Sequence, residues 1–358
     1  MNPREQELDY PWGDTLPGPG QAQAVAPDVR WIRMPLPFAL DHINLWLLRD
    51  RIDGRDGWTV VDCGIDRTEV RDTWEAVFEQ ALDGLPVLRV LVTHMHPDHV
   101  GLAHWLCARW QAPLWMSMTD YVQARAWSGV SVTDTSVEGS GPSGTGAARH
   151  FALHGLLDPE AQAAIRSRHD YYTRLVPDVP ARFHRLMDGQ DVVIGGRPWR
   201  VIVGYGHAPE HVSLWCHELN VLISGDMVLP RISTNVSVFD QEPEADPLRL
   251  YLDSLAAYDD LPADALVLPS HGRPFRGLHQ RVAQQRSHHA DRLAEVLAAC
   301  AQPRSAHDLL PVLFRRTLDL HQLSFAMGES IAHLHALYFQ GALRRILGED
   351  GVYRFQQA

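Results

Sequence analysis

Three histidines and one aspartate stand close together in the run His94-Met95-His96-Pro97-Asp98-His99. The residues before it, 87–93, form a near-continuous apolar run, which is typical of a strand buried on both faces. Alternate side chains at a strand end lie on one side, so His94 and His96 can converge on one ion, while the following turn directs Asp98 and His99 toward a second. Burying these titratable groups without compensation would be costly, and metal coordination supplies the compensation. The run therefore predicts a metal site.

Three later segments add further ligand types, each after a predicted strand. They are Gly206-His207-Ala208-Pro209-Glu210-His211, Ser224-Gly225-Asp226 and Pro269-Ser270-His271-Gly272. Together with the pattern H-x-H-x-D-H at 94–99, and in this order, they resemble the metallo-β-lactamase superfamily over roughly residues 35–275. The resemblance implies an αββα sandwich of the α/β class with the metals at strand ends.

The resemblance also implies a binuclear centre. Its expected ligands are His94, His96 and His207 for one divalent ion and Asp98, His99 and His271 for the other, with Asp226 bridging both. Asp62, in Val-Val-Asp-Cys-Gly, is expected either to orient ligands through hydrogen bonds or to cap a turn. His211 is expected to support or pack beside the ligands rather than bind metal. Zinc is the expected metal, and iron and manganese suit the same ligands.

Two divalent ions in such a centre can share a water and lower its pKa toward about 7, and the bridging hydroxide can attack a carbonyl or phosphoryl centre. Asp98 is placed to accept the proton and is the expected catalytic residue. All 32 basic residues are arginines, so the chain has no lysine for a Schiff base or a P-loop. A Gly-x-Ser-x-Gly nucleophile elbow is also absent from the sequence. A metal-dependent hydrolase is therefore predicted.

The elements that must position these residues alternate between strands and helices. A helix is predicted near 67–82 and another up to about 110. Strands are predicted at 42–49, 58–61, 87–93, 191–204, 212–216, 221–225 and 265–268. Two β-rich halves flanked by helices, with ligands where strands end, favour a layered sandwich.

Two domains are expected. Residues 1–276 would form the catalytic domain, with a helical lid insertion at about 117–190 that contains the Ser/Gly-rich stretch 128–147. Residues 277–358 read as helices followed by a hairpin that turns at Gly348–Gly351, which is the outline of a winged helix. This module is expected to pack against the catalytic domain or against a second subunit, so a homo-oligomer is left open.

Charge and composition limit the kinds of binding partner that are expected. The net charge is −12, from 44 acidic and 32 basic residues, which argues against a polyanion binder. The expected recognition helix of the winged module, 324–338, contains no arginine, so nucleic acid is not expected. The polar N-terminus and the absence of about 20 consecutive apolar residues predict a cytoplasmic protein without a membrane segment. A small-molecule substrate is expected.

The resemblance also bears on substrate. Asp226 stands where the antibiotic-hydrolysing branch has a cysteine, and the C-terminus differs from the glutathione-binding domain of glyoxalase II. The architecture most resembles the glyoxalase II-like and lactamase-β-2-like hydrolases, which favours a small thioester or ester. A metal-dependent endoribonuclease or phosphodiesterase, or a lactonase, is the alternative. Tyr171, Tyr172 and Arg231 are the expected substrate contacts.

Overall fold

The computed structural model describes residues 2–129 and 144–358. Most of the Ser/Gly-rich stretch, 130–143, lies outside the described residues. The chain forms two compact units. The first consists of Met1–Gly129, Thr173–Thr234 and Leu255–Val282; the second consists of Asn235–Ser254, Ala283–Ala358 and the described part of Val130–Tyr172.

In the described part of the first unit, one sheet has seven strands in chain order. They are β1 Gln23–Ala26, β2 Val29–Pro35, β3 His42–Ile52, β4 Arg55–Val61, β5 Val87–Leu91, β6 Leu114–Ser117 and β7 Phe183–Leu186. Neighbours from β1 to β4 are antiparallel, and those from β4 to β7 are parallel. Parallel strands place their carboxyl ends along one edge, and β4, β5 and β6 therefore deliver the residues after them to the same place.

The second sheet of this unit has the order β12-β11-β10-β9-β8. Its strands are β8 Asp191–Ile194, β9 Arg197–Gly204, β10 His211–Cys216, β11 Val221–Gly225 and β12 Leu266–Pro269. The predicted strand 191–204 is thus a hairpin of two strands. Gly195 and Gly196 form its turn, both with positive φ (60° and 78°), which residues without a Cβ adopt readily.

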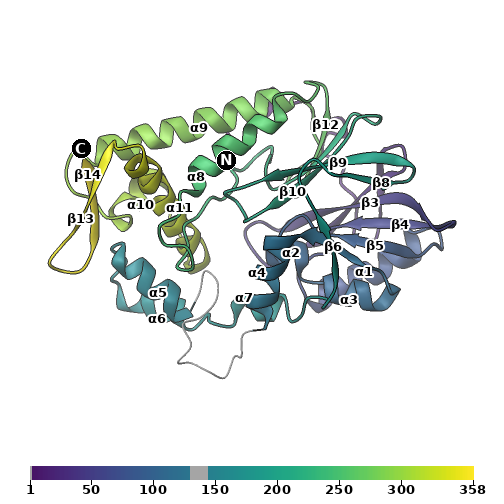
Figure 1. The fold of residues 1–358 in the computed structure, drawn as a ribbon, viewed down its shortest axis with the longest axis horizontal. Helices are drawn as coiled ribbons and strands as arrows, with labels where there is room; N and C mark the ends of the chain where they lie inside the picture. The colour runs from purple at the N-terminus through teal and green to yellow at the C-terminus, as the bar shows by residue number, and fades with distance from the viewer. Residues whose placement is uncertain (1, 130–143) are drawn as a thin grey trace. The chain divides into compact units, whose positions relative to one another are not determined.

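The two sheets share one hydrophobic core. Trp31, Trp46 and Leu48 from the first sheet are buried in the same cluster as Trp199 and Leu214 from the second. Such shared burial is the expected basis of a layered sandwich. Four helices of this unit are α1 Thr68–Gln80, α2 Pro97–Val100, α3 Ala103–Trp110 and α4 Met118–Ser128. Helices α1 and α3 lie on one side of the first sheet (Figure 1).

The second unit is mainly helical. Its helices are α5 Gly144–Leu153, α6 Pro159–Arg166, α8 Pro247–Ser254, α10 Leu310–Leu313, α11 Leu320–Phe339 and most of α9 Leu278–Ala299. The short helix α7, Tyr171–Leu175, spans the division between the units. The chain ends in an antiparallel hairpin of β13 Leu343–Leu347 and β14 Tyr353–Gln357 (Figure 1). Helices followed by a hairpin are the order that the sequence predicts for this end of the chain.

Single 3₁₀ turns complete the elements: η1 Glu5–Glu7, η2 Leu255–Tyr258 and η3 His307–Leu309. No helix in the described ranges is both long enough and apolar enough to cross a membrane.

Three histidines lie together in the interior of the second unit. The ring centroid of His154 is 4.9 Å from that of His150 on α5 and 6.0 Å from that of His335 on α11. Burial lowers the pKa of His150 to about 4 and that of His154 to about 2, and the neighbouring imidazoles add to both shifts. All three side chains are therefore neutral in the folded protein at neutral pH.

We expect these histidines to make the second unit sensitive to acid. The pKa values of these histidines in the folded protein lie below the value of about 6.5 in the unfolded chain. The free energy of unfolding is therefore unaffected by them above about pH 6.5 and decreases as the pH is lowered further. His154→Phe should reduce the loss of unfolding free energy between pH 7.5 and 5 by about 2 kcal/mol. Urea unfolding at both pH values measures this. His307→Gln, at an exposed histidine of the same unit, is the control, and equal acid sensitivity of His154→Phe and wild type would contradict the prediction.

Candidate metal centre

The carboxyl ends of β4 and β5 are joined by one carboxylate. Asp62 follows β4 directly, with a positive φ of 65°. Its Oδ1 accepts a hydrogen bond from the backbone N–H of Thr93, at 2.8 Å, just before His94. The run that follows is turned into helix α2 by Pro97 at its first position, where a missing N–H is harmless. This turn separates His94 and His96 from Asp98 and His99, as the sequence predicts.

One group of ligand atoms comes from four residues of three segments. Nitrogen or oxygen atoms of His94, His96, His207 and Asp226 all lie within 4.8 Å of one another. The Nε2 atom of His94 is 2.8 Å from Nδ1 of His96 and 3.2 Å from Nε2 of His207. Burial, and then the neighbouring imidazoles, lower the pKa of His94 far below its usual value. Burial likewise lowers the pKa of His96 to about 3, so the rings of His94 and His96 present neutral nitrogen donors, the form that binds a metal ion.

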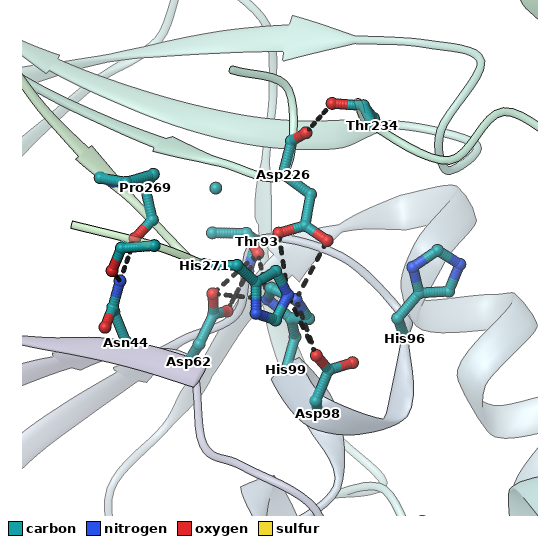
Figure 2. Close-up of polar contacts among 12 residues, drawn as sticks. Asn44, Asp62, Thr93, His96, Asp98, His99, Asp226, Thr234, Pro269 and His271 are labelled. Carbon is teal, nitrogen blue, oxygen red and sulfur yellow. Dashed lines mark hydrogen bonds and ion pairs between the residues drawn. The ribbon is translucent and has the colours of Figure 1, made fainter. Parts of the chain in front are cut away.

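A second group consists of Asp98, His99 and His271, again with ligand atoms within 4.8 Å of one another. The Oδ2 atom of Asp98 is 3.7 Å from Nε2 of His99 and 3.4 Å from Nε2 of His271. Figure 2 shows the carboxylates of Asp98 and Asp226 on either side of these imidazoles. The two predicted ligand sets are thus brought together as two adjoining groups.

Asp226 faces both groups. Its Oδ2 is 3.3 Å from Nε2 of His207 and 3.6 Å from Nε2 of His99, and its Oδ1 is 3.5 Å from Nε2 of His271. Burial favours the neutral acid, but the histidines outweigh it and hold the pKa of Asp226 well below its usual value. An ionised carboxylate therefore stands between the two groups, which is the arrangement a bridging ligand requires.

Hydrogen bonds on the far side of the rings of His99 and His271 fix which nitrogen each of these two residues presents to an ion. Asp62 Oδ2 lies 2.8 Å from Nδ1 of His99, and the backbone oxygen of His42 accepts from Nδ1 of His271 at 2.9 Å. In both rings Nε2 is then left for an ion, and such outer contacts orient ligands in metal sites. Asp62 thus contacts both the ring of His99 and the backbone just before His94, and its role in orienting the ligands stays a prediction.

His211 lies behind the ligands. It is fully buried, and its Nε2 accepts a hydrogen bond from the backbone N–H of Asp226, at 3.0 Å. The approach is close enough that a Cβ on Gly225 would lie 2.4 Å from this ring, so only glycine fits there. His211 therefore contacts the loop that carries Asp226, and its supporting role stays a prediction.

The residues present fit divalent metal ions. Among the described residues, buried Nε2 of His99 and Oδ1 of Asp226 have no hydrogen-bond partner. A buried ionised oxygen without a partner is costly unless a cation compensates it. The donor set of five imidazoles and two carboxylates suits zinc, iron or manganese, and does not choose among them.

Sequence reasoning missed one residue that joins the ligand loops. Asp120, in the first turn of α4, is fully buried, and its oxygens accept from the backbone N–H of Met95 at 2.8 Å and of Glu210 at 2.6 Å. Burial raises its pKa to about 6. It fixes the loop of His94 and His96 relative to the loop of His207. Apart from the nearby Ser117 hydroxyl, its partners are backbone groups far away in the chain, so the sequence does not show which loops it joins.

The three expected substrate contacts are divided between the two units. Arg231 lies in the first unit, where its guanidinium is 3.7 Å from the carboxylate of Glu5. Tyr171 and Tyr172 belong to the second unit; the guanidinium of Arg168 lies 4.3 Å from the ring centroid of Tyr171, and Tyr172 is buried. A role in substrate binding stays a prediction for all three.

Two facing sheets that carry a cluster of histidines and aspartates at their strand ends are typical of one class of protein, the metal-dependent hydrolases with an αββα sandwich fold. The metallo-beta-lactamase superfamily model matches residues 39–271, and the model of the metallo-beta-lactamase-like C-terminal domain matches residues 293–358. The chain therefore belongs to the metallo-β-lactamase superfamily. This confirms the predicted fold class and a metal-dependent hydrolase.

The chain is also similar to individual proteins. The crystal structure of a beta-lactamase domain protein from Burkholderia ambifaria is 55% identical, covers 99% of each chain and superposes with a TM-score of 0.92. A probable metallo-hydrolase, YqjP, of Bacillus subtilis is 23% identical over 91% of this chain and 97% of its own. The beta-lactamase-like protein 2 homolog of Caenorhabditis elegans is 32% identical, but over only 32% of this chain and 36% of its own.

Proposed function

We propose that this protein is a binuclear metal-dependent hydrolase that acts on a small thioester or ester. The binuclear part is supported by the position of Asp226: its Oδ2 lies between His207 of one ligand group and His99 of the other, and its Oδ1 faces His271 of the second group. Divalent ions bound there would polarise the substrate oxygen and supply an activated water. His94, His96 and His207 would hold one ion, and Asp98, His99 and His271 the other.

The chain's own groups have distinct roles in this proposal. Asp98 is the acceptor of the proton that the attacking water gives up, because it is the more solvent-accessible of the two carboxylates in the centre, with 20% of its side chain exposed against 9% for Asp226. His211 and Asp62 move no proton; they fix the Asp226 loop and the His99 ring. Asp120 fixes the two histidine loops.

Apolar side chains near the His207 loop support an acyl substrate. Met118 and Met187 directly follow Ser117 and Leu186, which are paired across β6 and β7, so they leave the sheet side by side. The Asp188 carboxylate accepts from the N–H of Val203, two residues before Tyr205. Met118, Met187 and Tyr205 are all exposed. An apolar acyl group would bury surface against these three exposed side chains, called the apolar rim below.

The test is turnover of the zinc-, iron- and manganese-loaded full chain on thioesters, esters, lactones, β-lactams and phosphodiesters. We expect thioester or ester cleavage, with higher kcat/KM as the acyl chain lengthens by a few carbons. Met187→Glu, at the apolar rim, should remove this chain-length preference. Hydrolysis of phosphodiesters alone would overturn the acyl substrate and favour the endoribonuclease alternative, and lactone cleavage alone would favour the lactonase.

A further inference from the structure

The loop that carries His271 is held by the first residues of strand β3. This loop, Pro269–Gly272, follows β12 and supplies one ligand of the second group. The side-chain Nδ2 of Asn44 donates to the carbonyl oxygens of Pro269 at 2.8 Å and of Gly272 at 3.0 Å (Figure 2). The backbone N–H of Asn44 donates to the oxygen of Ser270 at 2.7 Å. One residue thus contacts the loop on both sides of His271.

Asn44 is itself fixed in orientation. It is fully buried, and its Oδ1 accepts from Nε1 of Trp31 at 2.9 Å. An indole N–H can only donate, so the oxygen of the amide must face Trp31 and the NH₂ group must face the loop. Both hydrogens of that group are used by carbonyls of the loop. A buried asparagine with this complete set of partners has one orientation and holds its neighbours to it.

His42 contacts the same loop two residues earlier on β3. Its backbone oxygen accepts from Nδ1 of His271 at 2.9 Å, and its Nε2 accepts from the backbone N–H of Gly272 at 3.0 Å. The carboxylate of Asp41, 2.7 Å from Nδ1 of His42, accepts a hydrogen bond from the N–H at that nitrogen, which leaves Nε2 as an acceptor. Gly272 has φ 90°, and a Cβ there would lie 2.8 Å from Pro230, so only glycine fits at this position of the loop.

We propose that Asn44 and His42 are positioning residues for His271: they hold its imidazole where Nε2 can bind an ion together with Asp98 and His99. This inference rests on the proposed binuclear function. Both residues act on the metal position formed by Asp98, His99 and His271 and not on the other. The His94, His96 and His207 group lies on other loops, which Asp120 and His211 hold. Loss of the β3 contacts should therefore weaken the second metal position and leave the first intact.

The experiment is stepwise titration of the metal-free full chain with Zn²⁺ against a competing chelator, with metal content measured after dialysis. Asn44→Leu removes the side-chain hydrogen bonds at similar size. His42→Phe removes one acceptor at a partly exposed ring and is the milder variant should Asn44→Leu fold poorly. We expect the first ion to bind as in wild type in both. The second should bind at least about tenfold more weakly in both, and more weakly still in Asn44→Leu.

Thr59→Val is the matched control, because it removes a buried hydrogen bond, Thr59 Oγ1 to Asp50 Oδ2 at 2.6 Å, within the same sheet but outside these loops. It should bind both ions as wild type does. Unchanged second-ion affinity in Asn44→Leu and His42→Phe would overturn the positioning role alone. Equal weakening of both ions would also overturn it, since that is the result of general destabilisation. A wild-type chain that binds a single ion would instead overturn the binuclear proposal.

Discussion

Replacing Asp226 by alanine is expected to lower turnover about a thousandfold, a loss of about 4 kcal/mol of transition-state stabilisation. The reason is that the Asp226 carboxylate faces both ligand groups, with its oxygens 3.3 Å from Nε2 of His207 and 3.5 Å from Nε2 of His271. Its removal deprives both groups of a negative charge and leaves His94, His96 and His207 as the ligands of the first group. Metal content should fall from two ions toward one or fewer per chain.

Metal content and kcat, measured on the same preparation, test this expectation. Asp226→Asn is the matched variant, because it keeps the size of the side chain and removes the charge, and it should lie between wild type and Asp226→Ala. Asp191→Ala, which removes an exposed carboxylate paired with Arg200, should leave both quantities unchanged. Two tightly bound ions in Asp226→Ala would show that this residue is not a shared ligand.

The ligand groups could be predicted because their pattern is local. His94 to His99 follow a buried strand directly, and strand alternation and one turn suffice to direct them to two places. The later ligands, His207, Asp226 and His271, were predicted only through the resemblance to the superfamily. In the structure, the parallel pairing of β11 and β12 brings Asp226 and His271 to one edge.

The residues that hold the ligands could not be predicted in the same way. Asn44 bonds to backbone groups 225 and 228 positions away, and Asp120 to one 90 positions away. Backbone carbonyls and N–H groups are present at every residue, so no side-chain pattern marks such contacts. Asp62 and His211 are the residues of this kind that the sequence does indicate, because Asp62 stands directly at the end of β4 and His211 stands in the segment that carries His207.

The secondary structure shows a similar limit. The prediction of one strand over 191–204 overlooked the turn at Gly195-Gly196, although two adjacent glycines are a recognised hairpin signal. Strand β7, Phe183–Leu186, joins the edge of the first sheet from within the stretch predicted as a helical insertion. Among the described strands it pairs with β6 alone, and a short edge strand of mixed burial has no clear alternation to reveal it.

Asp98→Asn is expected to lower kcat by about 10²- to 10⁴-fold, the usual contribution of a general base, while KM changes only a few-fold. Burial favours the neutral form of Asp98, but His99 and His271 outweigh it and lower its pKa to about 2, so the carboxylate can accept a proton at neutral pH. Asparagine keeps the shape and cannot accept that proton. Because Asp98 is not in the His94 group, one ion should stay bound, and metal content must be measured beside kcat. A large fall in kcat with metal content unchanged would assign Asp98 to proton transfer; a fall only in proportion to lost metal would make it a ligand alone, and near-normal turnover would remove it from the mechanism.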